Sequence, residues 1–189
     1  MVEGNLKPMS RVLRALAALL LLTAALAGCK KEKTEAPSEQ PAFTFTVYPG
    51  ARYLAQLTEL DKRAATVEKP NQPAPPIAIY DTDAPLDTVA NFYVQSYGYA
   101  GVASDASNNL SAAKPPAYYR TGDLQSDVKA IEPVLQKLEQ KVDLSKAQGK
   151  YRAVEIDSKV NRPRVTIQRP YFDVTQSQVV DRTIILMAP

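Results

Sequence analysis

The sequence predicts an α+β domain in which an antiparallel sheet has two or three helices packed mainly on one face. Two patterns carry this prediction. Runs of β-branched and aromatic residues, separated by turn-forming residues, fill the C-terminal third and recur near the start of the domain. Between them, apolar residues recur at steps of three and four, which is typical of amphipathic helices. A chain of 189 residues, 45% of them hydrophobic, is long enough for one such domain and an export segment.

The N-terminal segment has the pattern of an export signal. Two arginines precede an apolar run from Ala15 to Ala27, which only Thr23 interrupts. This run is too short to cross a bilayer as a helix, but it has the length of a signal-peptide core. We therefore expect residues 1–28 to be a cleaved signal peptide, with Met9 as an alternative start because residues 1–8 add nothing that a signal needs.

The end of this run places a branched apolar residue and two small residues before the single cysteine of the chain, in the order Leu26-Ala27-Gly28-Cys29. This order resembles the lipobox of bacterial lipoproteins. The resemblance implies that signal peptidase II recognises Leu26, Ala27 and Gly28 and cuts before Cys29. It also implies a diacylglyceryl group on the cysteine sulfur and a further acyl chain, such as palmitate, on the new amino terminus. Several acyl chains, at ~0.8 kcal/mol per buried methylene, would anchor the protein to a membrane.

The alternative interpretation of this run is an ordinary membrane helix, or a buried apolar helix, with an incidental cysteine. The residue after the cysteine bears on location. Lys30 is not the aspartate that is associated with retention at the inner membrane of bacteria with two membranes. The resemblance therefore implies the periplasmic leaflet of the outer membrane. Because lipid would occupy the Cys29 sulfur, the chain can form no intrachain disulfide in that oxidising compartment.

Composition excludes several classes of function. The chain has no histidine, which removes serine-histidine and cysteine-histidine hydrolases and histidine-bearing zinc sites. Residues 1–28 hold three of the 23 basic and one of the 20 acidic residues, so the mature chain has a formal charge of about +1. This balance gives no electrostatic reason to expect a nucleic acid partner. We expect no cofactor.

The mature chain should consist of a tether and one domain. Residues 30–42 are polar and proline-bearing and contain no large apolar residue, so residues 29–42 should remain a flexible tether. The domain should span residues 43–189. Its first part should contain a strand at 43–48, a turn at Pro49-Gly50, an amphipathic helix over 53–67 whose start could equally extend a strand, a proline-rich loop at 70–76 and a strand at 77–80.

The next helix is predicted from about 84 to 97. Asp83 can cap its start, Pro85 lies in its early turn, and Gly98 is placed to end it. Asp83 and Asp81 could instead bind a hard cation, but the further oxygen ligands and the glycine of a calcium loop are missing. We therefore interpret these two aspartates as cap and turn residues.

Aromatic side chains on this helix allow a second interpretation. Phe92, Tyr93 and Tyr97 could line a pocket for an apolar ligand. Tyrosines at helical spacing are usually core residues, so the core interpretation is favoured.

A long loop should follow over 100–122, with a strand around 118–120. Apolar residues from Leu124 to Val142 then alternate steps of four and three, which predicts a helical stripe. Pro133 lies inside this stripe, so it is either one kinked helix or two helices with the proline in the first turn of the second. The stripe could pair with a partner as a coiled coil, but packing on the protein's own sheet is favoured.

The C-terminal third should form antiparallel strands. The runs are 151–157, 164–169 and 179–187, with a hairpin between 171–174 and the last run around a polar tip. Arg164 and Arg182 could face an acidic ligand, although basic residues on an exposed sheet face are ordinary.

Together with the strand and helix that follow, Tyr48-Pro49-Gly50-Ala51 and Phe92-Tyr93 resemble small uncharacterised envelope lipoprotein domains. This resemblance implies no activity. We expect a non-enzymatic binding or structural module that faces the periplasm and has an envelope protein as its partner. The alternative is a carrier with a small apolar ligand between helix and sheet. An enzyme would have to work with Asp, Lys or Tyr alone.

Overall fold

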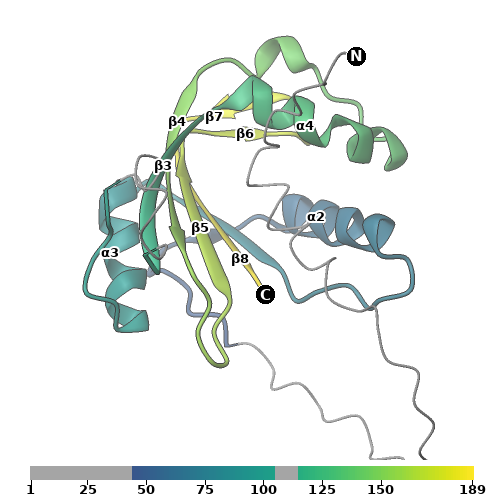
Figure 1. Ribbon diagram of the computed structural model, residues 1–189. Helices are drawn as coiled ribbons and strands as arrows, with labels where there is room; N and C mark the ends of the chain where they lie inside the picture. The colour runs from purple at the N-terminus through teal and green to yellow at the C-terminus, as the bar shows by residue number, and fades with distance from the viewer. Residues whose placement is uncertain (1–43, 105–114) are drawn as a thin grey trace, which may run out of the picture. The chain divides into compact units, whose positions relative to one another are not determined.

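Six antiparallel strands form the main sheet, in the order β1-β2-β8-β5-β4-β3 (Figure 1). The computed structural model describes residues 44–104 and 115–189. The strands are β1 (Arg52–Tyr53), β2 (Ala78–Thr82), β3 (Ala117–Asp123), β4 (Lys150–Ile156), β5 (Arg164–Arg169) and β8 (Thr183–Ala188). A second sheet pairs β6 (Tyr171–Asp173) with β7 (Gln178–Val180), and the helices are α2 (Ala55–Glu68), α3 (Leu86–Tyr97), α4 (Leu124–Lys137) and the short 3-10 helix η2 (Leu144–Lys146). The α+β class and the antiparallel sheet are confirmed.

The main core lies between α3 and one face of the sheet. Val154, Ile167 and Ile185 are direct cross-strand neighbours on β4, β5 and β8, and all three are fully buried. Val89 and Tyr93 of α3 are fully buried in the same cluster. Alternate residues of the central strands therefore form one apolar surface, and the four-residue step of α3 covers it.

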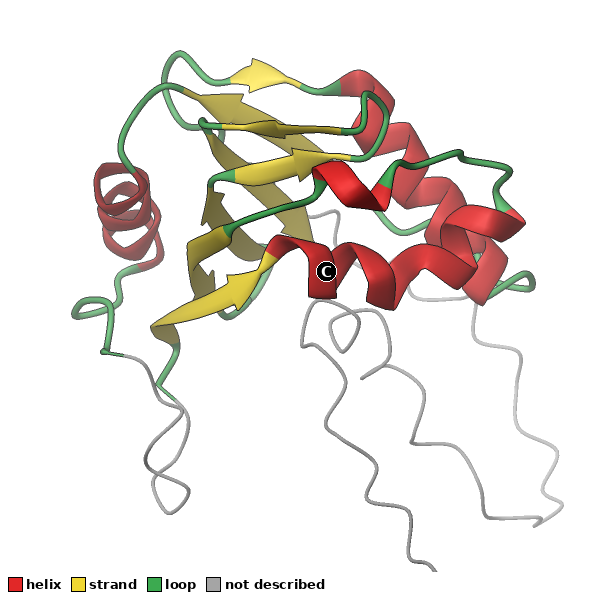
Figure 2. Cartoon of the chain, turned by 90° about the horizontal axis from the view of Figure 1, so that it is seen from above, coloured by secondary structure: helices red, strands yellow, loops and turns green. Residues whose placement is uncertain are grey.

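The other two helices, α2 and α4, lie on the opposite side of the sheet (Figures 1 and 2). On that face Glu155, Thr166 and Leu186 are direct neighbours across β4, β5 and β8. Thr166 and Leu186 are partly exposed, so this face is less completely covered than the α3 face. Two described helices thus share one side, and α3 alone covers the other.

The proline inside α4 does not divide it into two helices. α4 is one helix from Leu124 to Lys137, and Pro133 lies well beyond its first turn. Asp123 caps the start, because its side chain accepts a hydrogen bond of 2.9 Å from the Ser126 amide. Leu124, Val128 and Leu135 of the predicted stripe are buried within this protein, whereas Val142 lies beyond the helix.

Three local predictions were wrong. The run 179–187 is not one strand, because it divides into β7 and β8, which belong to different sheets. Residues 44–48 form no strand, since no neighbouring strand pairs with them; instead the Tyr48 ring packs edge-on against Phe92, with 5.2 Å between ring centres. Residue 43 lies outside the described residues. Asp83 does not cap α3: the cap residue is Pro85, without a side-chain hydrogen bond. The Asp83 carboxylate pairs with Arg182 instead.

Other predictions agree with the structure. The turn at Pro49-Gly50 forms, with the Ala51 amide 3.0 Å from the Tyr48 carbonyl oxygen. The sequence left open whether the start of the first helix extends a strand. In the structure Arg52–Tyr53 is a strand, and the helix begins at Ala55. Gly98 ends α3 in the left-handed conformation, at φ 65°. No helix within 44–104 or 115–189 is long and apolar enough to cross a membrane.

Candidate functional site

The residues predicted to be processed lie outside the described part of the chain. These are Cys29, which would carry lipid, and the signal peptidase recognition residues Leu26, Ala27 and Gly28. Their roles remain predictions from the sequence.

The three aromatic residues suggested for a ligand pocket occupy two environments. Tyr93 and Tyr97 are buried in the core beneath α3, and the Tyr97 hydroxyl donates a hydrogen bond of 2.7 Å to the Pro163 carbonyl oxygen. Burial raises the pKa of Tyr97 to about 12. Phe92 is partly exposed and contacts the Tyr48 ring. The two tyrosines therefore serve as core residues, whose hydroxyls stay protonated.

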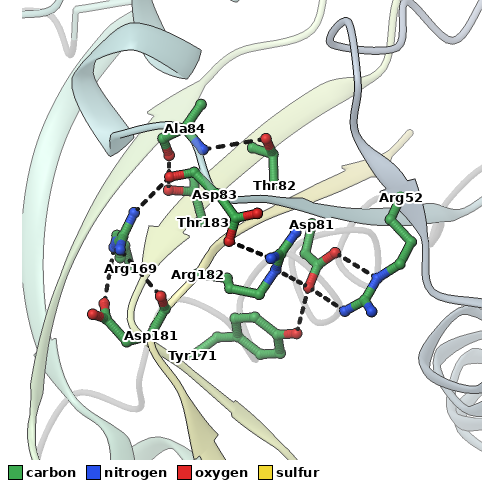
Figure 3. A network of polar contacts seen from close by, with 10 residues as sticks. All are labelled: Arg52, Asp81, Thr82, Asp83, Ala84, Arg169, Tyr171, Asp181, Arg182 and Thr183. Carbon is green, nitrogen blue, oxygen red and sulfur yellow. Dashed lines mark hydrogen bonds and ion pairs between the residues drawn. The ribbon is translucent and has the colours of Figure 1, made fainter.

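The densest polar cluster surrounds Asp81 on β2 (Figure 3). Its side chain is fully buried, and it accepts hydrogen bonds from three residues that lie on β1, on β6 and just before β8. Arg52 of β1 donates through Nε and Nη2, at 3.1 and 2.8 Å. Arg182, just before β8, donates through Nε at 2.8 Å, and the Tyr171 hydroxyl of β6 donates at 3.1 Å. The carboxylate thus links both sheets.

These contacts define the charge of Asp81. Burial alone would raise the pKa of this carboxyl, but the hydrogen bonds from Arg52, Arg182 and Tyr171 hold it below its ordinary value. Asp81 is therefore ionised at neutral pH. Because four donor atoms already bind its two oxygens, it is poorly placed to accept a proton from a substrate or to bind a metal ion.

The surrounding charges are also engaged within the protein. Arg182 pairs with Asp83 in addition to Asp81, and Arg169 pairs with Asp181 at 2.9 Å. The Thr183 hydroxyl donates to the Ala84 carbonyl oxygen at 2.6 Å. Arg182 was expected on a solvated sheet face. The structure corrects this prediction, because the Arg182 side chain is only 27% exposed and its guanidinium binds the buried Asp81.

A second buried network lies on the face that α2 and α4 share. Arg120 of β3 donates to Glu155 of β4 at 2.6 Å, and Thr166 of β5 donates to the other oxygen of Glu155 at 2.8 Å. Arg120 also donates to the Tyr151 hydroxyl, which donates to Asp127 of α4. Burial would lower the pKa of Arg120, but Glu155 and Tyr151 raise it, so this guanidinium stays charged. The network ties α4 to the sheet.

Asp61 differs from these paired acids. It is partly buried on α2, and no described residue forms a hydrogen bond or ion pair with its carboxyl. Loss of hydration, with a smaller contribution from Glu68, raises its pKa to about 6. A raised pKa can mark a reacting acid, but Glu68 is a second acid, and no described residue forms a hydrogen-bonded acid-base pair with Asp61.

Sequence reasoning missed the Asp81 cluster because its members are far apart in the chain. Tyr171 and Arg182 are 90 and 101 residues from Asp81. One signal was available, since Asp81 directly follows the apolar run Ile77-Ala78-Ile79-Tyr80. A carboxylate in a buried strand requires a partner, which makes a cation pair a better interpretation than a turn residue.

Within the described residues, no group of three or more cysteine, aspartate or glutamate side chains is arranged to hold a metal ion. No protein-family model, curated protein or solved structure matches this chain.

Proposed function

We propose that this protein is a bacterial envelope lipoprotein, lipidated on Cys29 and held to the periplasmic leaflet of the outer membrane. The observation that carries the proposal is the sequence that ends in Leu26-Ala27-Gly28-Cys29, with arginines before its apolar run and a polar segment after it. The domain of residues 43–189 then faces the periplasm as a non-enzymatic binding or structural module for an envelope protein.

The polar chemistry of the domain supports a non-enzymatic role. Its two buried networks, around Asp81 and around Glu155, join strands and helices to one another through bonds within the protein. A catalytic acid or nucleophile must instead keep an atom available to its substrate. These charges stabilise the fold, and contact with a partner therefore falls to the surface.

Mass spectrometry of the mature N-terminal peptide tests the anchor. Membranes from cells that produce the wild type should yield a peptide that begins at Cys29 and carries two or three acyl chains. Cys29→Ser should abolish both the lipid and the cleavage, and the protein should no longer be acylated. Lys31→Ser, two residues away in the same polar segment, is the matched control and should be processed like the wild type.

An unmodified and uncleaved N-terminus in the wild type would contradict the proposal and leave a membrane-helix protein. Location has a separate test in membranes separated on a density gradient. Lys30→Asp should move the lipoprotein from the outer toward the inner membrane, whereas Lys31→Asp should not. Equal distribution of the two variants would remove the argument for the outer membrane but keep the anchor.

A further inference from the structure

The turn between β4 and β5, residues 157–163, has an unusual apex. Val160 is 89% exposed, against 46% for Tyr53, the next most exposed large apolar residue in the described part of the chain. Lys159 and Arg162 pair across the turn, so Val160 and Asn161 occupy its two central positions. Polar residues normally fill such positions because they hydrate well. At 89% exposure, Val160 packs little of its side chain against the described part of the protein.

Two cations flank this apex. The Lys159 ammonium donates to the Tyr97 carbonyl oxygen and lies 4.4 Å from the centre of the Tyr99 ring. The Arg162 guanidinium donates to the Ser96 carbonyl oxygen and lies 5.2 Å from the Tyr97 ring centre. Both positive charges stabilise the C-terminal end of α3, because the last carbonyl groups of a helix have no partner within it and carry partial negative charge. These contacts hold the charges beside the apex.

The turn itself carries a positive formal charge. Within residues 157–164, Lys159, Arg162 and Arg164 outnumber the single acid Asp157, which gives a formal charge of +2. A surface with an apolar apex and flanking cations matches the boundary between the head groups and acyl chains of an anionic membrane.

The polypeptide reaches the domain at this turn. The Thr44 amide donates a hydrogen bond of 3.0 Å to the Asn161 carbonyl oxygen, so the first described residue is fixed beside the apex. Residues 30–43 lie between this point and Cys29. Whatever its conformation, a segment of this length spans at most ~50 Å. Lipid on Cys29 would therefore hold the turn within that distance of the bilayer. β6 and β7 lie at the opposite end of the domain from this turn (Figure 1).

We propose that the β4–β5 turn rests on the anionic surface of the membrane that holds Cys29, with Val160 at the depth of the head groups and with Lys159 and Arg162 beside lipid phosphates. The inference rests on the proposed lipid anchor. Contact through one turn is weak by itself, and it becomes populated because the anchor confines the domain to the surface. The rest of the domain then faces the periplasm in one preferred orientation.

A fluorescent label at the apex tests the inference in the complete lipoprotein. Cys29 is the single cysteine of the chain and would carry lipid, so Val160→Cys introduces one reactive thiol for an environment-sensitive dye. Val179→Cys is the matched control, since Val179 is an exposed valine of β7 at the opposite end of the domain. Each labelled protein is inserted into vesicles of phosphatidylethanolamine and phosphatidylglycerol, with and without a lipid that carries a quencher near its head group.

The dye at position 160 should show a blue-shifted emission and severalfold more quenching than the dye at position 179. Replacing phosphatidylglycerol by phosphatidylcholine, or raising the salt concentration, should reduce the quenching at 160, because the lysine and arginine lose their anionic partners. Quenching that is equal at the two positions overturns the inference. A blue shift that grows with the protein-to-lipid ratio also overturns it, since this would indicate contact with a second copy.

Flotation of the same vesicles distinguishes this inference from the proposed function. If the acylated protein floats with the vesicles and position 160 stays unquenched, the anchor stands and the orientation is wrong. If the protein does not float and lacks the acyl mass, the proposed function itself fails.

Discussion

At the scale of single residues, two acids of the sheet are buried and ion-paired. Asp81 and Glu155 are buried acids on strands, and each is bound to at least one arginine and one hydroxyl group. A buried carboxylate is tolerated only when such partners replace its hydration, so the positions of Arg52, Arg120 and Arg182 are constrained by the acids that they meet.

Asp81→Ala should strongly destabilise the domain. The substitution removes the shared acceptor and leaves Arg182 and the Tyr171 hydroxyl without it, and breaking a buried ion pair in this way costs about 3–5 kcal/mol. Urea unfolding followed by circular dichroism measures the change. Asp181→Ala removes an exposed acid that pairs with Arg169 and is the control, with little change expected in the unfolding midpoint. Equal midpoints for the two variants would show that the Asp81 cluster does not stabilise the fold.

Asp61 should make the domain less stable as the pH rises. Its pKa of about 6 in the folded protein is above the ordinary value of 3.8, so the folded state binds the proton more tightly. Stability is then lost between about pH 4 and pH 6, and the penalty persists above pH 6. Asp61→Asn should therefore stabilise the protein by roughly 1–3 kcal/mol at pH 7.5 and by only about a third of that at pH 4.5.

Urea unfolding at both pH values tests this. Glu59→Gln, which removes the same charge on the exposed side of α2, should not reproduce the pH-dependent difference. If the difference in stability between Asp61→Asn and the wild type is the same at both pH values, the Asp61 carboxyl is not the destabilising group.

At the scale of elements, the ends and interruptions of helices follow local chemistry. Gly98 ends α3 at φ 65°, and its amide bonds back to the helix. A Cβ atom there would be 3.7 Å from the Lys159 ammonium, which is ordinary contact, so only the backbone conformation opposes a larger residue.

Gly98→Ala should lower the free energy of unfolding by about 1 kcal/mol, because the Cβ atom of an alanine is strained in the left-handed conformation. Gly101→Ala is the matched control, because nothing lies within 4 Å of its added Cβ and its φ is not in the left-handed region. Thermal unfolding of both variants gives the comparison. A loss at Gly101 as large as at Gly98 would contradict this account of the helix end.

Pro133→Ala should stabilise the protein by about 1–2 kcal/mol, because it restores a backbone hydrogen-bond donor inside α4 and removes a clash of the proline ring. This value is net of an opposing effect, since alanine gives the unfolded chain more conformational entropy than proline does. Pro133 is exposed, so the substitution removes little packing. Pro73→Ala, in the loop before β2, is the control and should be neutral or slightly destabilising. Chemical unfolding measures the change in the free energy of unfolding for each variant. A gain for Pro133→Ala without a gain for Pro73→Ala supports the prediction, and the same gain in both contradicts it.

At the scale of the whole molecule, the sheet joins the two ends of the described chain. β8 is the last strand in sequence, but it lies between β2 and β5 in the sheet. Ile185 and Met187 of β8 are fully buried against the strands beside it and the helix α3. The sheet therefore cannot be completed until the end of the chain is present.

A chain that ends at Asp181 should lose cooperative unfolding, because β2 and β5 would have no strand between them. Removal of Pro189 alone, an exposed residue after β8, is the control and should leave the transition intact. Circular dichroism during heating distinguishes a sharp transition from a gradual change. A sharp transition in the shorter protein would mean that the rest of the sheet is stable without β8.

Local patterns were enough to place most elements. The residues of α3, α4, β5 and the hairpin of β6 and β7 were predicted from spacing and turn chemistry, because these signals lie within a few neighbouring residues. The strand at 43–48 failed for the opposite reason, since β-branched composition forms a strand only where a neighbour supplies hydrogen bonds. Asp83 failed as a cap because Arg182, distant in sequence, competes for its carboxylate.

The sequence by itself determined the α+β class, most element positions and the prediction of a lipidated Cys29, since each depends on composition or on short-range order along the chain. Only the tertiary structure decided the strand order, the partners of Asp81 and Glu155, and the meeting of Thr44 with the β4–β5 turn. These features depend on contacts between residues far apart in the chain, such as Thr44 and Asn161, which are 117 positions apart. Such pairs leave no periodic signal in one sequence, because a long-range contact is selected by the packing of the entire sheet rather than by its neighbours in the chain.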